Sequence, residues 1–509
     1  MAAILNGIMK TYLRRRFKRI EMMRQNSIQL QDQILQQLIK KAEKTSWGHL
    51  YQYESIINRS DFIKRIPLQD YESIQPYIQK MMLGHSDILW PGYTKWFAKS
   101  SGTTSNQSKY IPVSKEKLRQ CLVPSGWDAL SIYYEQRPEA QLFSERSLIY
   151  GGSLYKYDAN PSVKYGDVSA IMIDHIPKVA KPFCSPSQEV ALMPDWEQKI
   201  ERIAKECMFE NISMMTGVPT WNIVLFKALL DVTGADHIHD IWPELSLYLH
   251  GGVSFEPYRS QFEEYLPKHM DYLEVYNASE GYFGVQDVIG RDDMLLMTNN
   301  GVYYEFIPVS ELDNTEPVSL SLEEVEIGIN YAIVISSCSG LWRYLVGDTI
   351  TFSSIQPFRI RITGRTKQFL NAFGEELMVS NTDTAIARAA EECNARIADY
   401  TVAPILLTRD QKGAHQWLIE FEKMPPDVTS FQSVLDRHLK IVNEDYAAKR
   451  YKNMALDIPK IDILPKGTFN NWLKDKEKLG GQNKIPRLSN QRNIVEEILS
   501  LTQLEQSYV

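Results

Sequence analysis

The sequence predicts an α/β protein with a large N-terminal domain of mixed β-sheets and helices and a small C-terminal α+β domain. The chain has 509 residues, which is too long for one compact core, so two or more domains are expected. Between residues 145 and 300, short apolar runs alternate with helical segments. This alternation is typical of an α/β domain with buried strands. Beyond residues 355–365 the elements become shorter, which indicates a second domain.

Composition excludes several classes of protein. Hydrophobic residues make up 44% and aromatic residues 11% of the chain, as in a well-packed globular protein. The formal net charge of −7 argues against a nucleic-acid binder. No run approaches the roughly 20 apolar residues of a membrane span, so we expect no stable membrane insertion. The odd number of cysteines, without a C-x-x-C pair, predicts a reduced cytoplasmic chain with neither disulfides nor zinc.

The N-terminus is apolar over residues 2–9 and basic over residues 10–19, the reverse of the order in a secretory signal. We interpret the basic segment as a solvated helix face, although contact with an anionic membrane or a partner stays open. A helix is expected over residues 27–42, capped by Ser27 and with Ile28 on its apolar face.

The elements of the large domain, residues 1–363, follow in order. Apolar and β-type runs predict strands, and longer periodic segments predict helices. The strands are expected over 94–98, 109–113 and 331–336, and a helix over 115–135. Between them the alternating runs are 147–150, 195–208 (a helix), 223–230, 245–249 and 273–276.

The small domain, residues 364–509, follows an alternating strand over 359–365. Its expected elements are a helix over 380–393, strands over 403–408, 415–422 and 457–464, and a helix whose apolar stripe runs from Phe431 to Tyr446.

A small, hydroxyl-rich loop lies between the strands at 94–98 and 109–113. Its backbone N–H and hydroxyl groups can surround a polyphosphate, and glycine allows the backbone to approach the anion. An ordinary surface turn has the same composition. The chain has no Walker A loop, no G-x-G-x-x-G, no H-E-x-x-H and no G-x-S-x-G. If the loop binds ATP, it therefore uses another architecture. The loop residues of interest are Ser100, Ser101, Gly102, Thr103, Thr104 and Lys109.

Five further motifs follow this loop in a fixed order. They are Gly251-Gly252, the run from Tyr276 to Gly281, the run from Gly340 to Asp348, Gly364-Arg365-Thr366-Lys367, and the run from Gly480 to Arg487. The ordered set resembles the adenylate-forming superfamily of acyl-CoA synthetases, adenylation domains and luciferases. Within it, the match is closest to the Gretchen Hagen family of acyl acid amido synthetases, and it covers nearly the whole chain. We expect a bacterial-type member.

Two features depart from the family pattern. Leu345 stands where the family commonly has a second arginine, although Arg343 lies two residues earlier. The run from Gly364 to Lys367 is more similar to that of acyl-CoA synthetases, so a thioester-forming ligase stays an alternative.

The resemblance implies a two-step reaction that uses ATP and Mg²⁺. A carboxylate attacks the α-phosphate of ATP, and an amine then attacks the acyl carbon of the acyl-adenylate. The small domain is implied to be mobile, with a hinge near residues 364–367. The implied substrates are a small carboxylic acid and an amino acid, and the chain is expected to be a monomer.

The resemblance also implies residue roles. Ser100 to Thr104 would hold the β- and γ-phosphates. Lys109 would help, unless it is only a solvated lysine at the end of its strand. Glu280 would hold Mg²⁺, unless it only caps a following helix. Asp348 would bind both ribose hydroxyls, unless it is a turn residue. Lys484 would stabilise the transition state of adenylation, unless it lies in a plain surface loop.

The remaining implied roles concern adenine, ribose and the acyl group. Ser279 and Ala278 would line the α-phosphate or adenine, Tyr276 would stack on adenine or belong to the core, and Gly251 and Gly252 would lie against adenine or form a simple turn. Arg365 would contact ribose, unless it forms an interdomain salt bridge. The candidates for an apolar acyl pocket are Leu122, Trp127 and Val218, for which a plain core position is the alternative. A non-enzymatic nucleotide-binding protein is a third interpretation.

Overall fold

The computed structural model confirms the mixed α/β class, with several sheets and helices followed by a C-terminal domain. It describes residues 2–100, 109–252, 255–312, 314–366, 369–370, 377–405, 413–443, 446–447, 450, 456–476, 484–489 and 491–507. The chain divides into two compact units. The first unit comprises Met1–Val253, Glu263–Val346 and Ile350–Arg361; the second comprises Ser254–Phe262, Gly347–Thr349 and Ile362–Val509. The predicted boundary at residue 364 stays a prediction.

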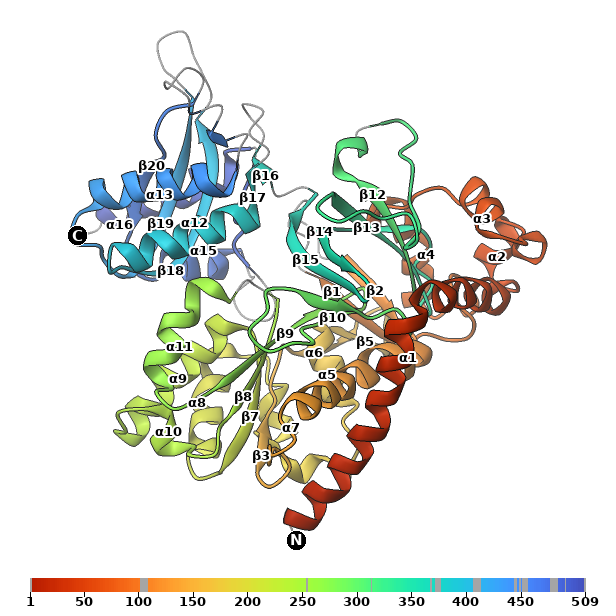
Figure 1. Ribbon diagram of the computed structural model, residues 1–509, viewed down its shortest axis with the longest axis horizontal. Coiled ribbons are helices and arrows are strands. Elements are labelled where there is room, and N and C mark those ends of the chain that lie inside the picture. The colour runs from red at the N-terminus through yellow and green to blue at the C-terminus, as the bar shows by residue number, and fades with distance from the viewer. Residues whose placement is uncertain are drawn as a thin grey trace. The chain divides into compact units, whose positions relative to one another are not determined.

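An eleven-stranded sheet dominates the described part of the first unit (Figure 1), and it includes residues 347–349 and 362–365 of the second. Its strand order is β12-β13-β14-β15-β11-β10-β9-β8-β7-β3-β6. The strands from β9 to β6 pair in parallel, and β10 pairs antiparallel with β9. The bounds are β3 Arg146–Leu148, β6 Cys184–Ser185, β7 Ile212–Gly217, β8 Leu247–His250, β9 Asp271–Asn277, β10 Tyr282–Val285, β11 Met294–Leu296, β12 Val302–Pro308, β13 Asn330–Ser337, β14 Tyr344–Ile355 and β15 Phe358–Arg365.

A four-stranded sheet in the described chain has the order β2-β1-β5-β4, with β1 Trp96–Ser100, β2 Lys109–Val113, β4 Leu154–Tyr157 and β5 Asn160–Gly166. The strand predicted at 109–113 is confirmed, and the one predicted at 94–98 begins two residues later. β4 and β5 were not predicted from the sequence.

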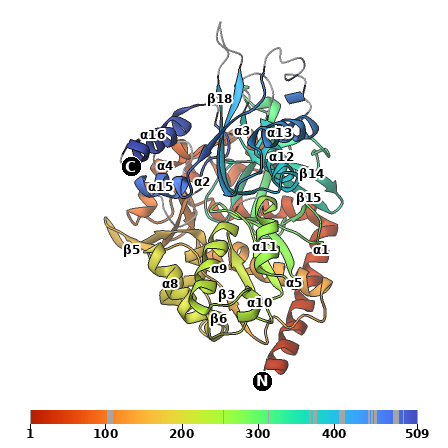
Figure 2. The same cartoon turned by 90° about the vertical axis from the view of Figure 1, so that its left-hand side faces the viewer.

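The helices within residues 2–265 lie around the sheets (Figures 1 and 2). Their bounds are α1 Ala2–Ala42, α2 Ser46–Leu50, α3 Arg59–Arg65, α4 Tyr71–Met82, α5 Val123–Gln136, α6 Val168–Asp174, α7 Gln188–Ala191, α8 Trp196–Cys207, α9 Pro219–Thr233, α10 Ile238–Ile241 and α11 Arg259–Tyr265. A π-helical turn, Lys117–Leu122, leads into α5, so the predicted helix at 115–135 is confirmed. The apolar run at 223–230 lies inside α9. None of the described helices meets the length and hydropathy that a membrane span needs.

The N-terminal helix differs from its prediction. α1 begins at Ala2, so Ser27 is not its cap; the Ser27 side chain is buried and donates to the Met23 carbonyl at 2.8 Å. A non-helical residue, Asn26, bends the helix at that point. Ile28 is 40% exposed rather than part of the apolar face. The solvated-face interpretation is wrong for Arg16, which pairs with the buried Asp128 at 2.5 Å.

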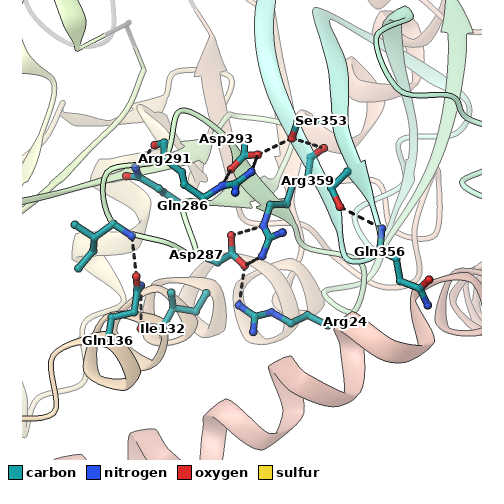
Figure 3. A network of polar contacts seen from close by, with 12 residues as sticks. Arg24, Ile132, Gln136, Gln286, Asp287, Arg291, Asp293, Ser353, Gln356 and Arg359 are labelled. Carbon is teal, nitrogen blue, oxygen red and sulfur yellow. Dashed lines mark hydrogen bonds and ion pairs between the residues drawn. The ribbon is translucent and has the colours of Figure 1, made fainter.

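A network of buried carboxylates joins α1 to the sheet (Figure 3). Asp287 accepts a hydrogen bond from Arg24 of α1 at 2.7 Å and two from Arg359 of β15 at 2.9 Å. Asp293 accepts from Arg291 at 2.7 and 2.5 Å and from Ser353 of β14 at 2.7 Å. Because buried charges need partners, this network specifies where α1 meets β14 and β15.

The described part of the second unit contains a three-stranded sheet, β18-β19-β20, and a two-stranded sheet, β16-β17. The bounds are β16 Phe369–Leu370, β17 Leu377–Met378, α12 Val379–Glu392, β18 Arg396–Ile405, β19 Ala414–Lys423, α13 Val428–Val442, β20 Lys460–Leu464, α15 Thr468–Asp475 and α16 Asn493–Ser507. The predicted helix at 380–393 and strand at 415–422 are confirmed. β18 starts at Arg396, well before the predicted 403, and α13 ends at Val442, so Tyr446 is not on its stripe.

Candidate functional site

The β1–β2 hairpin positions both ends of the hydroxyl-rich loop. Ser100 and Lys109 are direct cross-strand partners, so the loop leaves and re-enters the sheet at neighbouring positions. The Lys109 ammonium lies 5.7 Å from the centre of the Tyr71 ring, and the Tyr71 hydroxyl accepts from the Tyr110 N–H at 2.8 Å. Helix α4 therefore braces the second strand of the hairpin. Ser101, Gly102, Thr103 and Thr104 lie outside the described residues.

The turn from Ala278 to Gly281 joins β9 to β10. The Ala278 N–H donates to the Gly281 carbonyl at 2.8 Å, and the Gly281 N–H donates to the Ala278 carbonyl at 3.2 Å. Ser279 and Glu280 form the tip of this turn and are only 4% and 7% exposed. The idea that Glu280 caps a helix is wrong, because strand β10 follows it. Tyr276 is buried, with its ring edge-on to Phe283 at 5.0 Å.

Gly251 and Gly252 lie at the same edge of the sheet. They follow β8, which pairs in parallel with β9. A Cβ on Gly251 would lie 2.2 Å from the Val275 carbonyl oxygen, and Gly252 has φ +84°, so the backbone requires glycine at both positions. The structure thus brings these glycines beside the strand that ends at the turn with Glu280. Carboxyl ends of parallel strands are common ligand-binding positions.

Asp348 and Arg365 form an ion pair within the second unit. The Arg365 Nε lies 2.8 Å from Asp348 Oδ1. The pair belongs to β14 and β15, which the Thr363 hydroxyl links by donating to Thr349 Oγ1 at 2.9 Å. Both residues belong to the second compact unit, whereas the predicted boundary at residue 364 would separate them. The ion pair is thus present, and the salt-bridge alternative for Arg365 stays open. Asp348 is mostly buried and its partner is about one-third exposed.

Lys484 shares the electrostatic environment of this pair. Desolvation by surrounding protein atoms and repulsion from Arg365 lower the pKa of Lys484 to about 8. Attraction to Asp348 acts in the opposite direction. The residue keeps an exposed surface, so solvent screening moderates this effect. The charges of Asp348 and Arg365 therefore act on Lys484, which the sequence separates from both by more than a hundred residues.

The end of the C-terminal motif is anchored to β18. Arg487 pairs with Asp399, donates to the Tyr400 carbonyl at 2.9 Å, and lies 4.4 Å from the centre of the Tyr400 ring. The Val402 N–H donates to the Arg487 carbonyl at 2.8 Å. Arg487 thus fixes the chain three residues after Lys484. Residues 480–483 lie outside the described part.

Arg343 is a core residue and not part of the site. Its guanidinium lies 3.2 Å from both oxygens of the buried Glu305 and donates to the Ile66 carbonyl at 2.7 Å. Leu345, the departure from the family pattern, pairs through its N–H with the Gln69 carbonyl.

The acyl-pocket candidates are not brought together by any described contact. Leu122 is fully buried in the core. Trp127 stacks on Phe143 and meets Tyr12 of α1 edge-on at 6.0 Å, so the N-terminal helix covers one of its edges. Val218 is half-buried at the start of α9. A described cavity of about 490 Å³ near Ile149 and Ile173 includes none of the three in its lining.

Two residues of the site region escaped sequence reasoning. Lys117 is 1% exposed, and its ammonium donates to the Ser279 carbonyl at 2.6 Å. Asn277 has a buried side-chain oxygen that accepts no hydrogen bond from any of the described residues. Lys117 stands in the charged run Lys115-Glu116-Lys117 at the start of the predicted helix, so the local sequence does not mark it as buried.

Glu280 suits a metal ion that takes most of its ligands from bound phosphate and water. Among the described residues, no group of three or more His, Cys, Asp or Glu side chains could hold a metal ion. Mg²⁺ is commonly bound by one or two carboxylates together with phosphate oxygens and waters. The buried carboxylate of Glu280 fits that donor set.

Comparison with known proteins covers almost the entire chain. A jasmonoyl–L-amino acid synthetase of Nicotiana attenuata is 24% identical over 95% of both chains. A probable indole-3-acetic acid-amido synthetase of Arabidopsis thaliana is also 24% identical, over 94% of this chain and 92% of its own. Both relatives are plant proteins, so they give no support to the expected bacterial type.

Two solved structures share the fold. An acyl acid amido synthetase in complex with 2,4-DB superposes with a TM-score of 0.78 at 16% identity, covering 97% of this chain and 96% of that one. A 2-hydroxyisobutyryl-CoA ligase superposes with a TM-score of 0.57 at 13% identity, covering 93% and 91%.

Family models match three consecutive parts of the chain. They are the GH3 family N-terminal domain over residues 16–270, the GH3 family central domain over 295–365 and the GH3 family C-terminal domain over 380–493. Together they span most of the sequence in the order that the motifs predict. The chain therefore belongs to the GH3 family, the Gretchen Hagen family that its motifs resemble.

Proposed function

We propose that this protein is an ATP- and Mg²⁺-dependent acyl acid amido synthetase that joins a small carboxylic acid to an amino acid. The observation that carries the proposal is the match over at least nine-tenths of the chain to relatives named as a jasmonoyl–L-amino acid synthetase and a probable indole-3-acetic acid-amido synthetase. The first step joins a carboxylate oxygen to the α-phosphorus and releases pyrophosphate. In the second step the amine nitrogen attacks the acyl carbon, and AMP leaves with that oxygen.

In the first unit, the β1–β2 hairpin and the Glu280 turn would serve the phosphates. Ser100 to Thr104 would donate to the β- and γ-phosphates, with Lys109 at the end of the loop. Glu280 would hold Mg²⁺, which supplies positive charge opposite the developing negative charge on the phosphates. The adenine and α-phosphate would be lined by Gly251, Gly252, Tyr276, Ala278 and Ser279. The requirement for glycine at residue 251 comes from the nearby Val275 carbonyl, and at residue 252 from the positive φ, so it is equally compatible with a simple turn.

In the second unit, Asp348 would accept hydrogen bonds from both ribose hydroxyls. Its ion pair with Arg365 fixes the carboxylate and supports a ribose-side role for Arg365 as well. Lys484 would donate to the substrate carboxylate and α-phosphate during adenylation. A hinge near residues 364–367 would release Lys484 for the second step. A monomeric state and a cytoplasmic location complete the proposal.

The test is carboxylate-dependent exchange of labelled pyrophosphate into ATP with a panel of acids, followed by mass spectrometry of the product with amino acids and CoA supplied. We expect exchange with at least one acid and an amide product. A thioester would assign the chain to the alternative of an acyl-CoA synthetase. An absence of exchange across the panel would leave a nucleotide-binding protein without ligase activity.

A further inference from the structure

Lys117 is a buried lysine whose ammonium contacts the turn that carries Glu280. Its Nζ donates to the Ser279 carbonyl at 2.6 Å. Lys117 opens a π-helical turn inside an otherwise α-helical stretch, a distortion that occurs frequently at functional sites. The Lys117 N–H donates to the Ser114 hydroxyl at 2.9 Å, and that hydroxyl donates to the Cys338 carbonyl at 2.6 Å. The lysine backbone is therefore held by the end of β2 and the segment after β13.

The surroundings of Lys117 explain why a charged side chain is placed there. A buried ammonium is costly unless hydrogen bonds and opposite charge compensate it. Burial lowers the pKa of Lys117, while nearby Cys121, Glu280 and Cys338 act in the opposite direction. The Ser279 carbonyl supplies a hydrogen bond and Glu280 supplies opposite charge. The lysine and the acidic turn thus compensate each other inside the first unit.

We infer that Lys117 is a positioning residue that fixes the Ser279–Glu280 peptide, so that the Glu280 carboxylate keeps one place for Mg²⁺. The inference rests on the proposed function, and Lys117 would act through the turn and not through contact with ATP or the metal. Ser279 and Glu280 are the two residues between the paired ends of the turn. Without the ammonium, the Ser279 carbonyl would lose this donor in a buried position, and the peptide could rotate. Residues that orient metal ligands typically change metal affinity by 10–100-fold.

The experiment compares the full-length wild type with Lys117→Met. Hydrogen exchange of the nucleotide-free protein is measured by mass spectrometry on a peptide spanning residues 276–285. We expect exchange at the turn to become about ten-fold faster, with other peptides unchanged. Binding of Mn²⁺, a probe for the Mg²⁺ site, is measured by electron paramagnetic resonance in the presence of ATP. The half-saturating Mn²⁺ concentration should rise by about ten-fold or more.

Lys199→Met is the matched control. Lys199 is equally buried in the first unit and also donates to main-chain carbonyls, those of Gly151 at 2.7 Å and Gly152 at 3.2 Å. It should leave both the turn exchange and Mn²⁺ binding as in the wild type. An equal effect in the control would overturn the inference, because any lost buried ammonium would then produce it.

The remaining outcomes are decisive too. Wild-type exchange and Mn²⁺ binding in Lys117→Met would overturn the inference while the proposed function stands. If that variant does not fold, Lys117→Gln, which keeps a shorter neutral donor, replaces it under the same criteria. If the wild type binds no Mn²⁺ with ATP, the proposed function fails, and the exchange measurement alone decides whether Lys117 holds the turn.

Discussion

Lys484 has two charged neighbours of opposite sign, Asp348 and Arg365, and the motif containing it ends in an arginine anchored to β18. The sequence predicted all three residues from the order of their motifs. It could not predict that Arg365 would pair with Asp348, because the pairing depends on the register of β14 and β15. It missed Lys117 for a similar reason, since contact between residues 117 and 279 exists only in the folded chain.

Replacing Lys484 by alanine should reduce pyrophosphate exchange by about 10²-fold or more, because a positive charge opposite the developing phosphate charge is lost. The midpoint of thermal unfolding should stay close to that of the wild type, because the residue is exposed. Lys466→Ala, at an exposed lysine of the same unit paired only loosely with Glu422, is the control and should keep full exchange. Full exchange in Lys484→Ala would show that this lysine is merely a surface residue.

Glu280→Gln should raise the Mg²⁺ concentration for half-maximal exchange by about ten-fold or more, because a neutral amide is a weaker ligand for a hard cation. The measurement is a Mg²⁺ titration at fixed ATP. Glu201→Gln, at an exposed glutamate on α8 that pairs with Lys205, should leave the titration unchanged. An unaltered titration in Glu280→Gln would assign the residue to the turn alone.

At the scale of elements, period and turn chemistry predicted the helices and strands with one-sided apolar patterns. α12, whose buried residues recur on one face, is an example. α1 was predicted only in part because its first half carries arginines on several faces, and some of these form buried ion pairs. β4 and β5 carry mixed polar residues such as Lys156 and Lys164, so alternation did not mark them. The network of Asp287 and Asp293 depends on tertiary contacts between α1 and distant strands, which local patterns do not encode.

Asp293 gives this network a measurable pH dependence. Hydrogen bonds from Arg291 and Ser353 lower the pKa of Asp293 to about 2 from an ordinary value of 3.8. Burial acts in the opposite direction but is outweighed. A depressed pKa means that the native state favours the charged form. The resulting stability, about 2–3 kcal/mol, is complete above the unfolded pKa and is lost as pH falls through about 2.

Urea unfolding of the wild type and Asp293→Asn at pH 7 and pH 3 tests this contribution. The variant should be less stable at pH 7 by about 2–3 kcal/mol, and the difference should shrink by roughly half at pH 3. Asp292→Asn, at a neighbouring exposed aspartate, is the control for a general effect of charge. A difference between wild type and Asp293→Asn that does not change with pH would contradict the assigned pKa.

At the scale of the whole molecule, the sequence predicted the fold class and the family, because motifs in the family's order occur from residue 100 to residue 487. It did not predict that residues 254–262 and 347–349 would join the second compact unit, since such membership follows from packing and not from chain order. Among the residues proposed to act in the reaction, Glu280 belongs to the first unit and Lys484 to the second. The proposed reaction uses residues of each.

The most direct test of that chemistry follows an oxygen atom. The wild-type protein is supplied with ATP, Mg²⁺, an amino acid and a carboxylic acid labelled with ¹⁸O in both carboxylate oxygens. Mass spectrometry then measures the products. The acyl-adenylate mechanism predicts an amide and an AMP that carries one ¹⁸O for each amide formed, because the carboxylate oxygen that attacks the α-phosphorus leaves with AMP. Unlabelled AMP, or ADP and labelled phosphate in its place, would contradict the acyl-adenylate mechanism.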